Sequence, residues 1–216
     1  MADSYYIDTS KYSLKKMKKD LLGRDLILSR QPLKDGLEIN FQILEREGIH
    51  SLSELITALK NKPRIGEFSS RSGISEEYLI LLCREANSYL PNPVPLNKFS
   101  GIESRDIEKL AAAGIKNSRH LFEKTEPELD KLPDEIGISP NTLSELVGLA
   151  DLVRAYGVGP SFARILYDTG IHSINEFRGY SPRQVIELYE KETGKKTDFS
   201  SSDIKFSLDL VHALGL

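Results

Sequence analysis

One segment recurs three times along this 216-residue chain, and every copy contains a Gly-Ile pair. The copies read DGLEINFQILEREGIHSLSEL (35–55), GIESRDIEKLAAAGIKNSRHLF (101–122) and GVGPSFARILYDTGIHSINEF (157–177). The equivalent glycines are Gly48, Gly114 and Gly170, and a leucine stands four residues before each of them. An internal repeat constrains the fold strongly, because each copy has to form the same unit and pack against its neighbours.

Each copy predicts a pair of helices. Apolar residues seven and four positions before the glycine predict a helix with one buried face. The glycine ends this helix in a left-handed conformation, and the following isoleucine folds back onto it. A second helix then begins at a side-chain cap. The cap and the residue three positions later are Ser51 and Glu54, Asn117 and His120, and Ser173 and Glu176.

The rest of the chain continues the helical pattern. Amphipathic runs predict helices at about 76–90, 140–156, 182–192 and 202–214, and no stretch shows the sustained alternation of a strand. Pro91, Pro93 and Pro95 interrupt the pattern and predict a linker. We therefore expect an all-α protein with two parts, residues 1–94 and residues 95–216.

The composition excludes several classes of protein. With 39% hydrophobic and 28% charged residues, the chain can form an ordinary core and a solvated surface. Its single cysteine, Cys83, excludes an intrachain disulfide and a four-thiolate zinc site. No apolar run approaches the roughly 20 residues of a membrane span, and the N-terminus lacks the apolar stretch of a signal peptide. We expect a cytoplasmic protein that has no membrane partner.

Catalytic motifs are missing from the sequence. It contains no nucleophile elbow, P-loop, dinucleotide fingerprint or His-Glu-x-x-His zinc motif. We therefore predict a non-enzymatic protein that has no catalytic residue, metal site, cofactor or small-molecule substrate.

Residues 11–34 are strongly basic. They hold eight basic and two acidic side chains, a local charge of +6, in a chain whose net charge is −3. Such an arm contacts a polyanion, its own acidic body or a partner. Within residues 13–28, apolar residues alternate with lysines as in an amphipathic helix that caps its own protein, binds a partner or lies on a membrane, and the acidic remainder favours the first. The apolar residues are Leu14, Met17, Leu21, Leu22 and Leu26, and the lysines are Lys15, Lys16, Lys18 and Lys19.

The last repeat opens with the turn Gly157-Val158-Gly159-Pro160. Glycine permits a positive φ and lets another molecule approach the backbone closely. Because Pro160 starts a helix, the amides of Gly159 and Ser161 should point outward from its positive end. An exposed turn of this kind is an anion site, with phosphate as the natural occupant.

This repeat resembles the helix-hairpin-helix family, in which apolar-Gly-apolar-Gly-x-x-x-Ala leads into an apolar helix that ends in Gly-Ile. The matching residues are Gly157, Val158, Gly159, Ala163, Ile165, Leu166, Gly170 and Ile171. The repeated arrangement over residues 97–216, and more faintly 33–90, is similar to the tandem helix-hairpin-helix proteins of the DUF4332 family. The resemblance implies a compact array of such repeats, and in helix-hairpin-helix proteins the hairpin amides commonly hold DNA phosphates without reading sequence. The residues implied in phosphate binding are Gly157, Val158, Gly159, Ser161 and Arg164.

The sequence also departs from the DNA-binding pattern. Ser161 stands where DNA-binding members often have lysine or arginine, and Glu103 replaces the second glycine in the middle copy. In the first copy Asp35 occupies the first glycine position, and Glu38 lies near the hairpin tip. The hairpins accordingly pack helices together, contact DNA or RNA, or bind another anion.

Two hypotheses for function follow. The first is an interaction module whose repeats and basic arm bind a protein partner or a second copy. The alternative is sequence-independent DNA or RNA binding by the Gly157–Pro160 hairpin, with help from Lys15, Lys16, Lys18 and Lys19.

Overall fold

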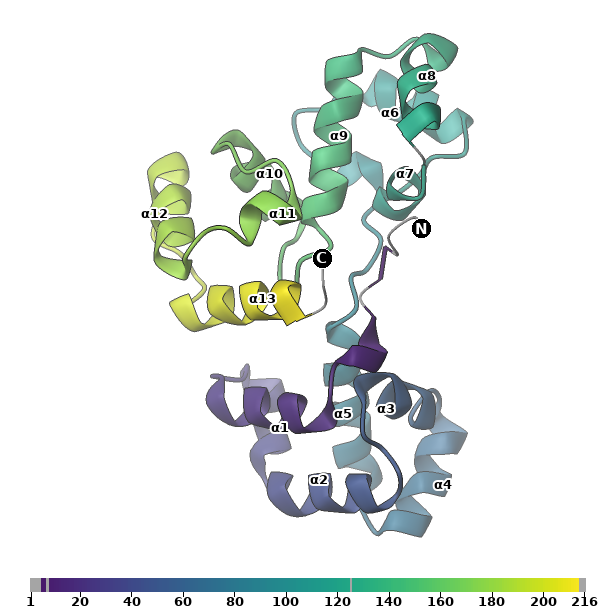
Figure 1. Ribbon diagram of the computed structural model, residues 1–216, viewed down its shortest axis with the longest axis vertical. Coiled ribbons are helices and arrows are strands. Elements are labelled where there is room, and N and C mark those ends of the chain that lie inside the picture. Colours follow the sequence, from purple (N-terminus) through teal and green to yellow (C-terminus); the bar gives the residue numbers. More distant parts are fainter. Residues whose placement is uncertain (1–4, 7, 125, 214–216) are drawn as a thin grey trace. The chain divides into compact units, whose positions relative to one another are not determined.

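In the computed structural model, the described part of the chain is helical throughout its regular elements (Figure 1). It comprises residues 5–6, 8–124 and 126–213, with the backbone alone at residues 126 and 213. Isolated antiparallel bridges join Ser13 to Ser51 and Pro95 to Asn117. The prediction of an all-α protein is confirmed, because no strand forms among these residues.

The chain divides into two compact units. The N-terminal unit is Asp8–Leu90, and the C-terminal unit is Pro91–Leu216 together with Met1–Ile7, of which Tyr5 and Tyr6 are described. The proline-rich segment therefore belongs to the C-terminal unit, whereas the boundary predicted from the sequence lies between residues 94 and 95.

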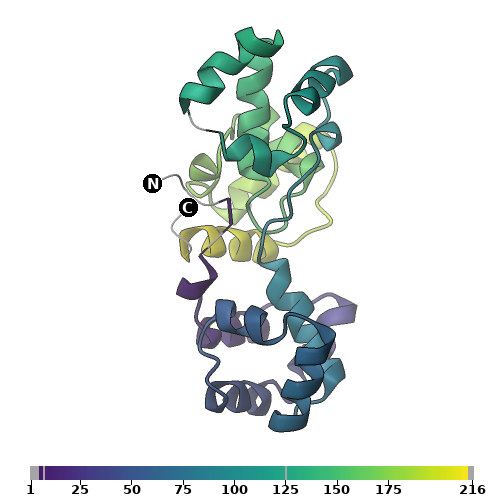
Figure 2. The ribbon, with the colours of Figure 1, turned by 90° about the vertical axis from the view of Figure 1, so that its right-hand side faces the viewer.

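The N-terminal unit is a bundle of short helices (Figures 1 and 2). They are η1 (Thr9–Lys11), α1 (Leu14–Gly23), η2 (Leu28–Lys34), α2 (Leu37–Arg46), α3 (Leu52–Ala58), α4 (Lys62–Ser72) and α5 (Glu76–Ser88), where η denotes a 3₁₀ helix. Helix α5 contacts η2, α3 and α4, while α1 packs against α2 and η2. Side chains from every α-helix fill the core, which includes Leu14, Met17, Leu21, Leu37, Phe41, Leu44, Leu52, Phe68 and Leu82.

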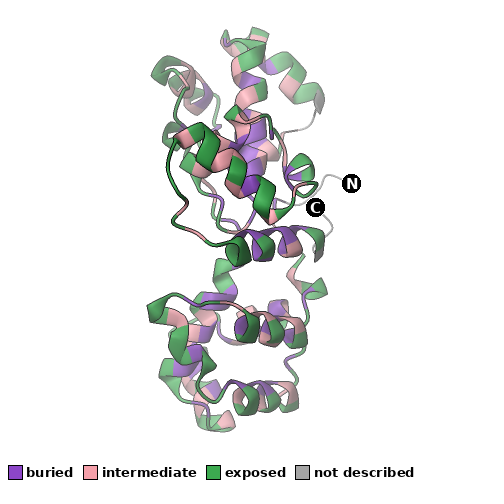
Figure 3. Ribbon diagram, turned by 90° about the vertical axis from the view of Figure 1, so that its left-hand side faces the viewer, coloured by how far each residue is buried: buried purple, intermediate pink, exposed green. Residues whose placement is uncertain are grey.

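The C-terminal unit is organised around helix α9 (Pro140–Leu152), which contacts α7, α8, α10 and α11. In Figure 3 the inner faces of the helices are coloured as buried and the outer faces as exposed. The unit's other elements are η3 (Leu96–Lys98), α6 (Ser104–Ala112), α7 (Ser118–Phe122), α8 (Glu126–Ile136), α10 (Pro160–Asp168), α11 (Ile174–Phe177), α12 (Pro182–Thr193) and α13 (Ser201–Ala213). Helix α12 packs against α10 and α13 and completes the unit.

The three repeats form the helix pairs α2–α3, α6–α7 and α10–α11. Gly48, Gly114 and Gly170 have φ values of 82°, 84° and 91°. The amide of each following isoleucine donates a hydrogen bond to the carbonyl of the leucine five residues earlier, at 3.0, 2.8 and 2.9 Å. These isoleucines are buried. The predicted ending of the first helix by a Gly-Ile pair is therefore confirmed in all three copies.

The second helix of each pair begins at the predicted cap. Three residues after the cap, the middle copy has a histidine where the other two copies have a glutamate. The Glu54 and Glu176 carboxylates accept hydrogen bonds from the amides of His50 and His172, both at 2.7 Å. At the equivalent place, the Nδ1 atom of His120 lies 3.3 Å from the Lys116 amide. An imidazole therefore occupies the place of a carboxylate in the middle repeat.

Some helix boundaries differ from the prediction. The helix expected at 140–156 ends at Leu152, and the chain continues as a turn to the hairpin. Helices α4 and α8 were not predicted; α4 begins at an Asn61 cap, with Pro63 in its first turn. Among the described residues, no helix is both long enough and apolar enough to span a membrane.

Candidate functional site

The Gly157 hairpin, defined as residues 157–161, joins the turn after α9 to helix α10. Gly157 has a φ of 77°, a conformation that residues with a side chain rarely adopt, so the turn requires glycine at this position. The Val158 side chain is buried, and its amide donates to the carbonyl of Ala155 at 3.1 Å. Gly157, Gly159 and Ser161 are exposed. The expected exposed hairpin is thus present, anchored by one buried side chain.

Gly159 is not required by the fold. Its φ of −83° suits any residue, and a β-carbon built on it would meet no atom within 4 Å. It is the N-cap of α10, has no side-chain cap, and accepts the first hydrogen bond of the helix from Ala163 at 2.9 Å. Ser161 and Phe162 come before Ala163 in the first turn, so their amides have no acceptor within the helix. The tip of the hairpin therefore presents backbone donors at a positive helix end.

Arg164, a candidate phosphate contact, is engaged within its own unit. Its guanidinium donates to the carboxylates of Glu145 and Asp168, with 3.0 Å between its Nε and an Asp168 oxygen. Although partial burial opposes the shift, these hydrogen bonds raise the pKa of Arg164 above its ordinary value. Its side chain is only 15% exposed. A phosphate would therefore have to compete with two carboxylates for this guanidinium.

Arg154, the other arginine close to the hairpin in sequence, is buried. It donates to the Asp151 carboxylate at 2.6 Å and to the carbonyl of Tyr5 at 3.2 Å. Its guanidinium lies 3.9 Å from the centroid of the Phe122 ring. The hairpin is therefore lined by backbone amides, and both neighbouring arginines are held by protein groups.

The hairpins of the other two copies differ from this one. In the middle copy Gly101 keeps the positive φ, at 87°, but the exposed residue at the N-cap of α6 is Glu103. In the first copy the residue with positive φ is Gly36, at 62°, whereas Asp35 has a φ of −72°. Asp35, at the first glycine position of the gapless alignment, therefore lacks the positive φ, and Gly36, which has it, is also the N-cap of α2.

The basic segment 11–34 is an integral part of the N-terminal unit. Leu14, Met17 and Leu21 of α1 are fully buried, as expected for a helix that caps its own protein. A helix that binds a partner or a membrane would need the same apolar face, which is already buried within the unit. Helix α1 ends at Gly23, however, and Leu22, expected on the apolar face, is 53% exposed.

Most charges of this segment have partners in the unit. Lys16 pairs with Asp20 at 3.7 Å and Lys18 with Glu38 at 2.9 Å. Lys15 and Lys19 are exposed, and neither forms an ion pair with any residue that the structure describes. Of the four candidate lysines, these two retain the charge that is most available to a partner.

A buried carboxylate holds two further basic residues of the segment. Glu85 on α5 is 3% exposed and pairs with Arg24 at 2.5 Å and Arg30 at 3.5 Å. Lys34 donates to the carbonyl of Arg24 at 2.7 Å, at the end of α1. These contacts fix the chain between α1 and α2, so the charge of residues 11–34 stabilises the unit itself.

Exposed apolar side chains in this segment were not predicted from the sequence. Four side chains, which we name the Leu22 patch, are exposed large hydrophobic residues: Leu22 at 53%, Ile27 at 69%, Leu28 at 83% and Ile39 at 65%. Apolar residues of this size mark an interaction surface when they gather on one part of a protein. The available signal was the adjacent pair Ile27-Leu28, which follows the helix-ending Gly23 and lies outside the helical period.

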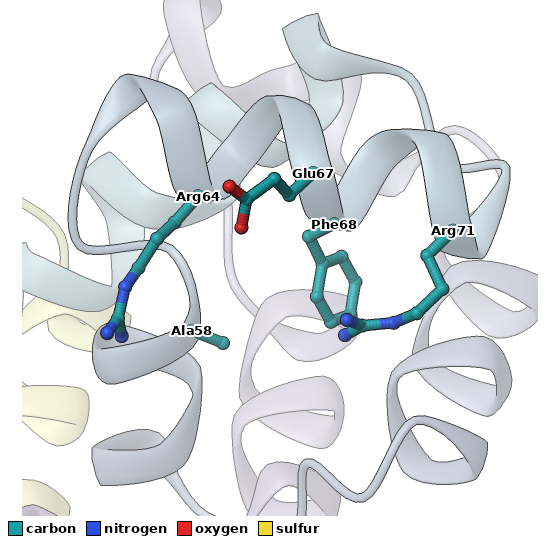
Figure 4. Close-up of a pocket in the computed structure, with 5 residues that line it drawn as sticks. All are labelled: Ala58, Arg64, Glu67, Phe68 and Arg71. Carbon is teal, nitrogen blue, oxygen red and sulfur yellow. The ribbon is translucent and has the colours of Figure 1, made fainter.

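A small pocket lies between α3 and α4 of the N-terminal unit (Figure 4). It encloses about 260 Å³ and is lined by Ala58, Arg64, Glu67, Phe68 and Arg71. Arg64 donates to the Thr57 carbonyl at 2.8 Å, and Arg71 pairs with Glu47 at 2.5 Å. The lining thus contains two arginines and one glutamate, and one of the arginines is already paired with a carboxylate outside the lining.

Two further observations concern metal binding and the single cysteine. No cluster of histidine, cysteine, aspartate or glutamate that could hold a metal occurs among them. Burial raises the pKa of the Cys83 thiol, whose sulfur lies 3.2 Å from the carbonyl oxygen of Leu59. A raised pKa disfavours the thiolate that nucleophilic chemistry requires.

Comparisons with known proteins identify one domain and one partial relative. The model of a family described as "Domain of unknown function (DUF4332)" matches residues 100–204. Over 81 residues the chain is 33% identical to a protein of Shewanella pealeana named DNA polymerase IV, a match that covers 38% of this chain and 22% of that protein. The chain thus spans about a fifth of the length of this relative. No solved structure matches. The resemblance to DUF4332 is confirmed for residues 100–204, while the helix-hairpin-helix identity of the repeats stays a prediction.

Proposed function

Because the DUF4332 family model that matches residues 100–204 describes a domain of unknown function, we propose a function from the geometry: a non-enzymatic module that binds a partner protein or a second copy. The observation that carries this proposal is the exposure of the four large hydrophobic side chains of the Leu22 patch, all within residues 22–39 of the N-terminal unit. We place the module in the cytoplasm, because a chain with a single cysteine forms no internal disulfide and needs no oxidising compartment.

The charges of the basic segment support a protein partner over a polyanion. Nucleic-acid affinity depends on the number of phosphates that lysine and arginine neutralise. Arg24 and Arg30 are committed to the buried Glu85, and Lys16 and Lys18 to acidic residues. Few basic side chains of the segment remain unpaired. This favours a protein contact in which apolar side chains supply most of the affinity and the remaining charges orient the partner.

The proposal is tested by placing a photo-crosslinking amino acid in the full chain at Leu28 and, as a control, at the exposed Lys60. We expect a discrete crosslinked species in cells from position 28 and none from position 60. Ile27→Gln combined with Ile39→Gln should remove that species, whereas Lys60→Gln combined with Lys62→Gln should not. Sedimentation velocity of the purified chain then separates a second copy, which gives a dimer, from a different protein. Crosslinking that is the same at both positions contradicts the proposal.

A second function, sequence-independent nucleic-acid binding, is supported by the exposed amides of the Gly157 hairpin. Gly159 is a glycine that neither backbone conformation nor local packing requires, as expected if another molecule approaches it closely. The partial relative named DNA polymerase IV agrees with this candidate. The contributions of Lys15, Lys16, Lys18 and Lys19 stay a prediction, and Lys16 and Lys18 already pair with Asp20 and Glu38.

This second function is tested by fluorescence anisotropy with short single-stranded and duplex DNA at several salt concentrations. Each neutralised phosphate of a duplex should contribute about −0.9 to the slope of log affinity against log salt, so one hairpin binds weakly. Gly159→Glu, which copies Glu103 of the middle repeat, should abolish binding by repelling phosphate. Gly159→Ala should retain the fold, because its β-carbon has open space around it. Tight binding that survives Gly159→Glu rules out the hairpin as the contact.

A further inference from the structure

Resting on the proposed interaction function, we infer that the Leu22 patch binds an acidic amphipathic helix of another protein. The apolar face of that helix covers Leu22, Ile27, Leu28 and Ile39. Its carboxylates face Lys15 and Lys19 on α1.

The outer face of α1 combines the basic and the apolar parts of this surface. Lys15, Lys19 and Leu22 follow the spacing i, i+4 and i+7, which places them on one stripe of the helix. All three are exposed, whereas Leu14, Met17 and Leu21 form the buried stripe. A ligand that contacts Leu22 from solvent therefore meets two lysines on the same stripe.

The segment after α1 presents its apolar side chains from a fixed backbone. Leu26 and Leu33 are buried and anchor the segment on either side of Ile27 and Leu28. The Arg30 amide donates to the Ile27 carbonyl at 2.7 Å. A preorganised apolar surface loses little conformational entropy when a partner covers it.

Two polar contacts hold α1 close to the start of α2, where Ile39 of the Leu22 patch lies. Lys34 donates to the carbonyl of Leu22 at 3.4 Å, which ties the end of η2 to the end of α1. Lys18 pairs with Glu38, the neighbour of Ile39, at 2.9 Å. Residues 18–22 and residues 34–39 are thus held together by two polar contacts.

The charge of this surface indicates the sign of its partner. The formal charge of residues 11–39 is +4, but Arg24 and Arg30 in this segment are neutralised by the buried Glu85. Lys15 and Lys19 form no ion pair among the described residues. Complementary carboxylates would pair with them at the rim of the contact, where charge raises the rate and the specificity of association.

Other occupants fit this surface less well. A symmetric pairing of two copies through the patch would bring Lys15 and Lys19 of both copies into one interface, and like charges oppose that arrangement. A membrane-surface helix inserts a wide apolar face, but the apolar stripe of α1 is buried in its own unit. Nucleic acid offers phosphates to the lysines but no matching surface to four exposed aliphatic side chains.

The test uses the full chain and two designed helical peptides with identical leucine positions, one with glutamates and the other with lysines at the polar positions. Fluorescence anisotropy should show saturable binding of the glutamate peptide and at least about 10-fold weaker binding of the lysine peptide. Ile27→Gln combined with Leu28→Gln should lower the affinity for the glutamate peptide about 10-fold or more, as expected at the centre of an interface. Lys15→Glu with Lys19→Glu should reverse the preference between the peptides. Lys60→Gln with Lys62→Gln, also at exposed positions, should change neither affinity.

Three outcomes overturn the inference. They are equal binding of the two peptides, binding of anionic lipid vesicles that the patch substitutions abolish while neither peptide binds, and a concentration-dependent dimer that the same substitutions disrupt. If one of them occurs while the crosslink at position 28 still depends on the patch, the interaction function stands and only the partner chemistry is wrong. If the crosslink is also independent of the patch, both fail.

Discussion

The carbonyl oxygen of His172 lies against Gly148 so closely that a β-carbon on residue 148 would be 2.6 Å from it. A ring carbon of Tyr167 would be 2.7 Å from the same β-carbon. Gly148 is in the middle of α9, so the central helix of the C-terminal unit contacts the α10–α11 repeat at this point through its backbone. Glycine is required here by close packing, although its backbone is helical.

Gly148→Ala should therefore destabilise the protein although alanine favours helices. We expect the free energy of unfolding to fall by about 1–3 kcal/mol, the usual cost of overpacking a core. Gly66→Ala in α4 is the matched control, because its β-carbon would have only an ordinary contact, 3.5 Å from a Glu76 oxygen. That change should raise stability by about 0.5–1 kcal/mol. Urea unfolding followed by circular dichroism distinguishes the two, and stabilisation by both substitutions would contradict the packing described.

Glu85→Gln should be strongly destabilising, because it leaves Arg24 and Arg30 without their carboxylate in a largely buried setting. Removing one partner of a buried ion pair costs about 3–5 kcal/mol. The control is Glu187→Gln, whose partner Arg183 is 88% exposed, and ion pairs on the surface contribute little to stability. Chemical denaturation of both variants measures the difference. Equal losses would show that the Glu85 cluster stabilises no more than a surface pair.

Tyr78 makes stability depend on pH in the alkaline range. Burial raises the pKa of Tyr78 to about 12, and its hydroxyl donates to the Leu33 carbonyl at 3.1 Å. Because the unfolded chain ionises near pH 10, the stabilisation from neutral Tyr78 is complete below pH 10 and is lost as the pH rises to about 12. Tyr78→Phe should thus be less stable than wild type at pH 7, and this deficit should shrink above pH 10. A constant difference between the variants across this range contradicts the assignment.

The His120 imidazole should be replaceable by the carboxylate that the other repeats use. His120→Glu should keep or slightly raise stability, because glutamate at this position completes the capping box seen at Ser51. His120→Ala removes the imidazole, whose Nδ1 lies 3.3 Å from the Lys116 amide and 3.1 Å from the Gly114 carbonyl oxygen, and should cost about 1 kcal/mol. Thermal unfolding near neutral pH compares the two. Equal destabilisation by both would mean that the side chain at residue 120 does not accept a hydrogen bond from the Lys116 amide.

The sequence predicts the parts of the fold that depend on local chemistry. Gly114 ends a helix because its backbone must be left-handed, and Asn117 starts one because its side chain accepts an amide hydrogen three residues on. Both signals lie within a few residues, so they are visible without tertiary contacts. The exposed hairpin is predictable for the same reason, because Gly157 and Pro160 fix its turn locally.

Features that depend on distant residues could not be predicted. Arg24 appears as free positive charge in the sequence, but its partner Glu85 lies on another helix. Leu22 appears to belong to the buried face of an amphipathic helix, but it lies on the outer stripe of α1 with Lys15 and Lys19 and is exposed. The offset between Asp35 and Gly36 arises because the first hairpin is shorter, which a gapless comparison of the copies cannot represent.

The most direct test of the proposed interaction surface is an amide-resolved NMR titration of the full chain with the glutamate peptide. The account predicts that the largest chemical-shift changes fall within residues 15–39, with little change at residues 157–163, and that Ile27→Gln with Leu28→Gln removes them. Shifts confined to the Gly157 hairpin, or spread evenly over both units, would contradict it.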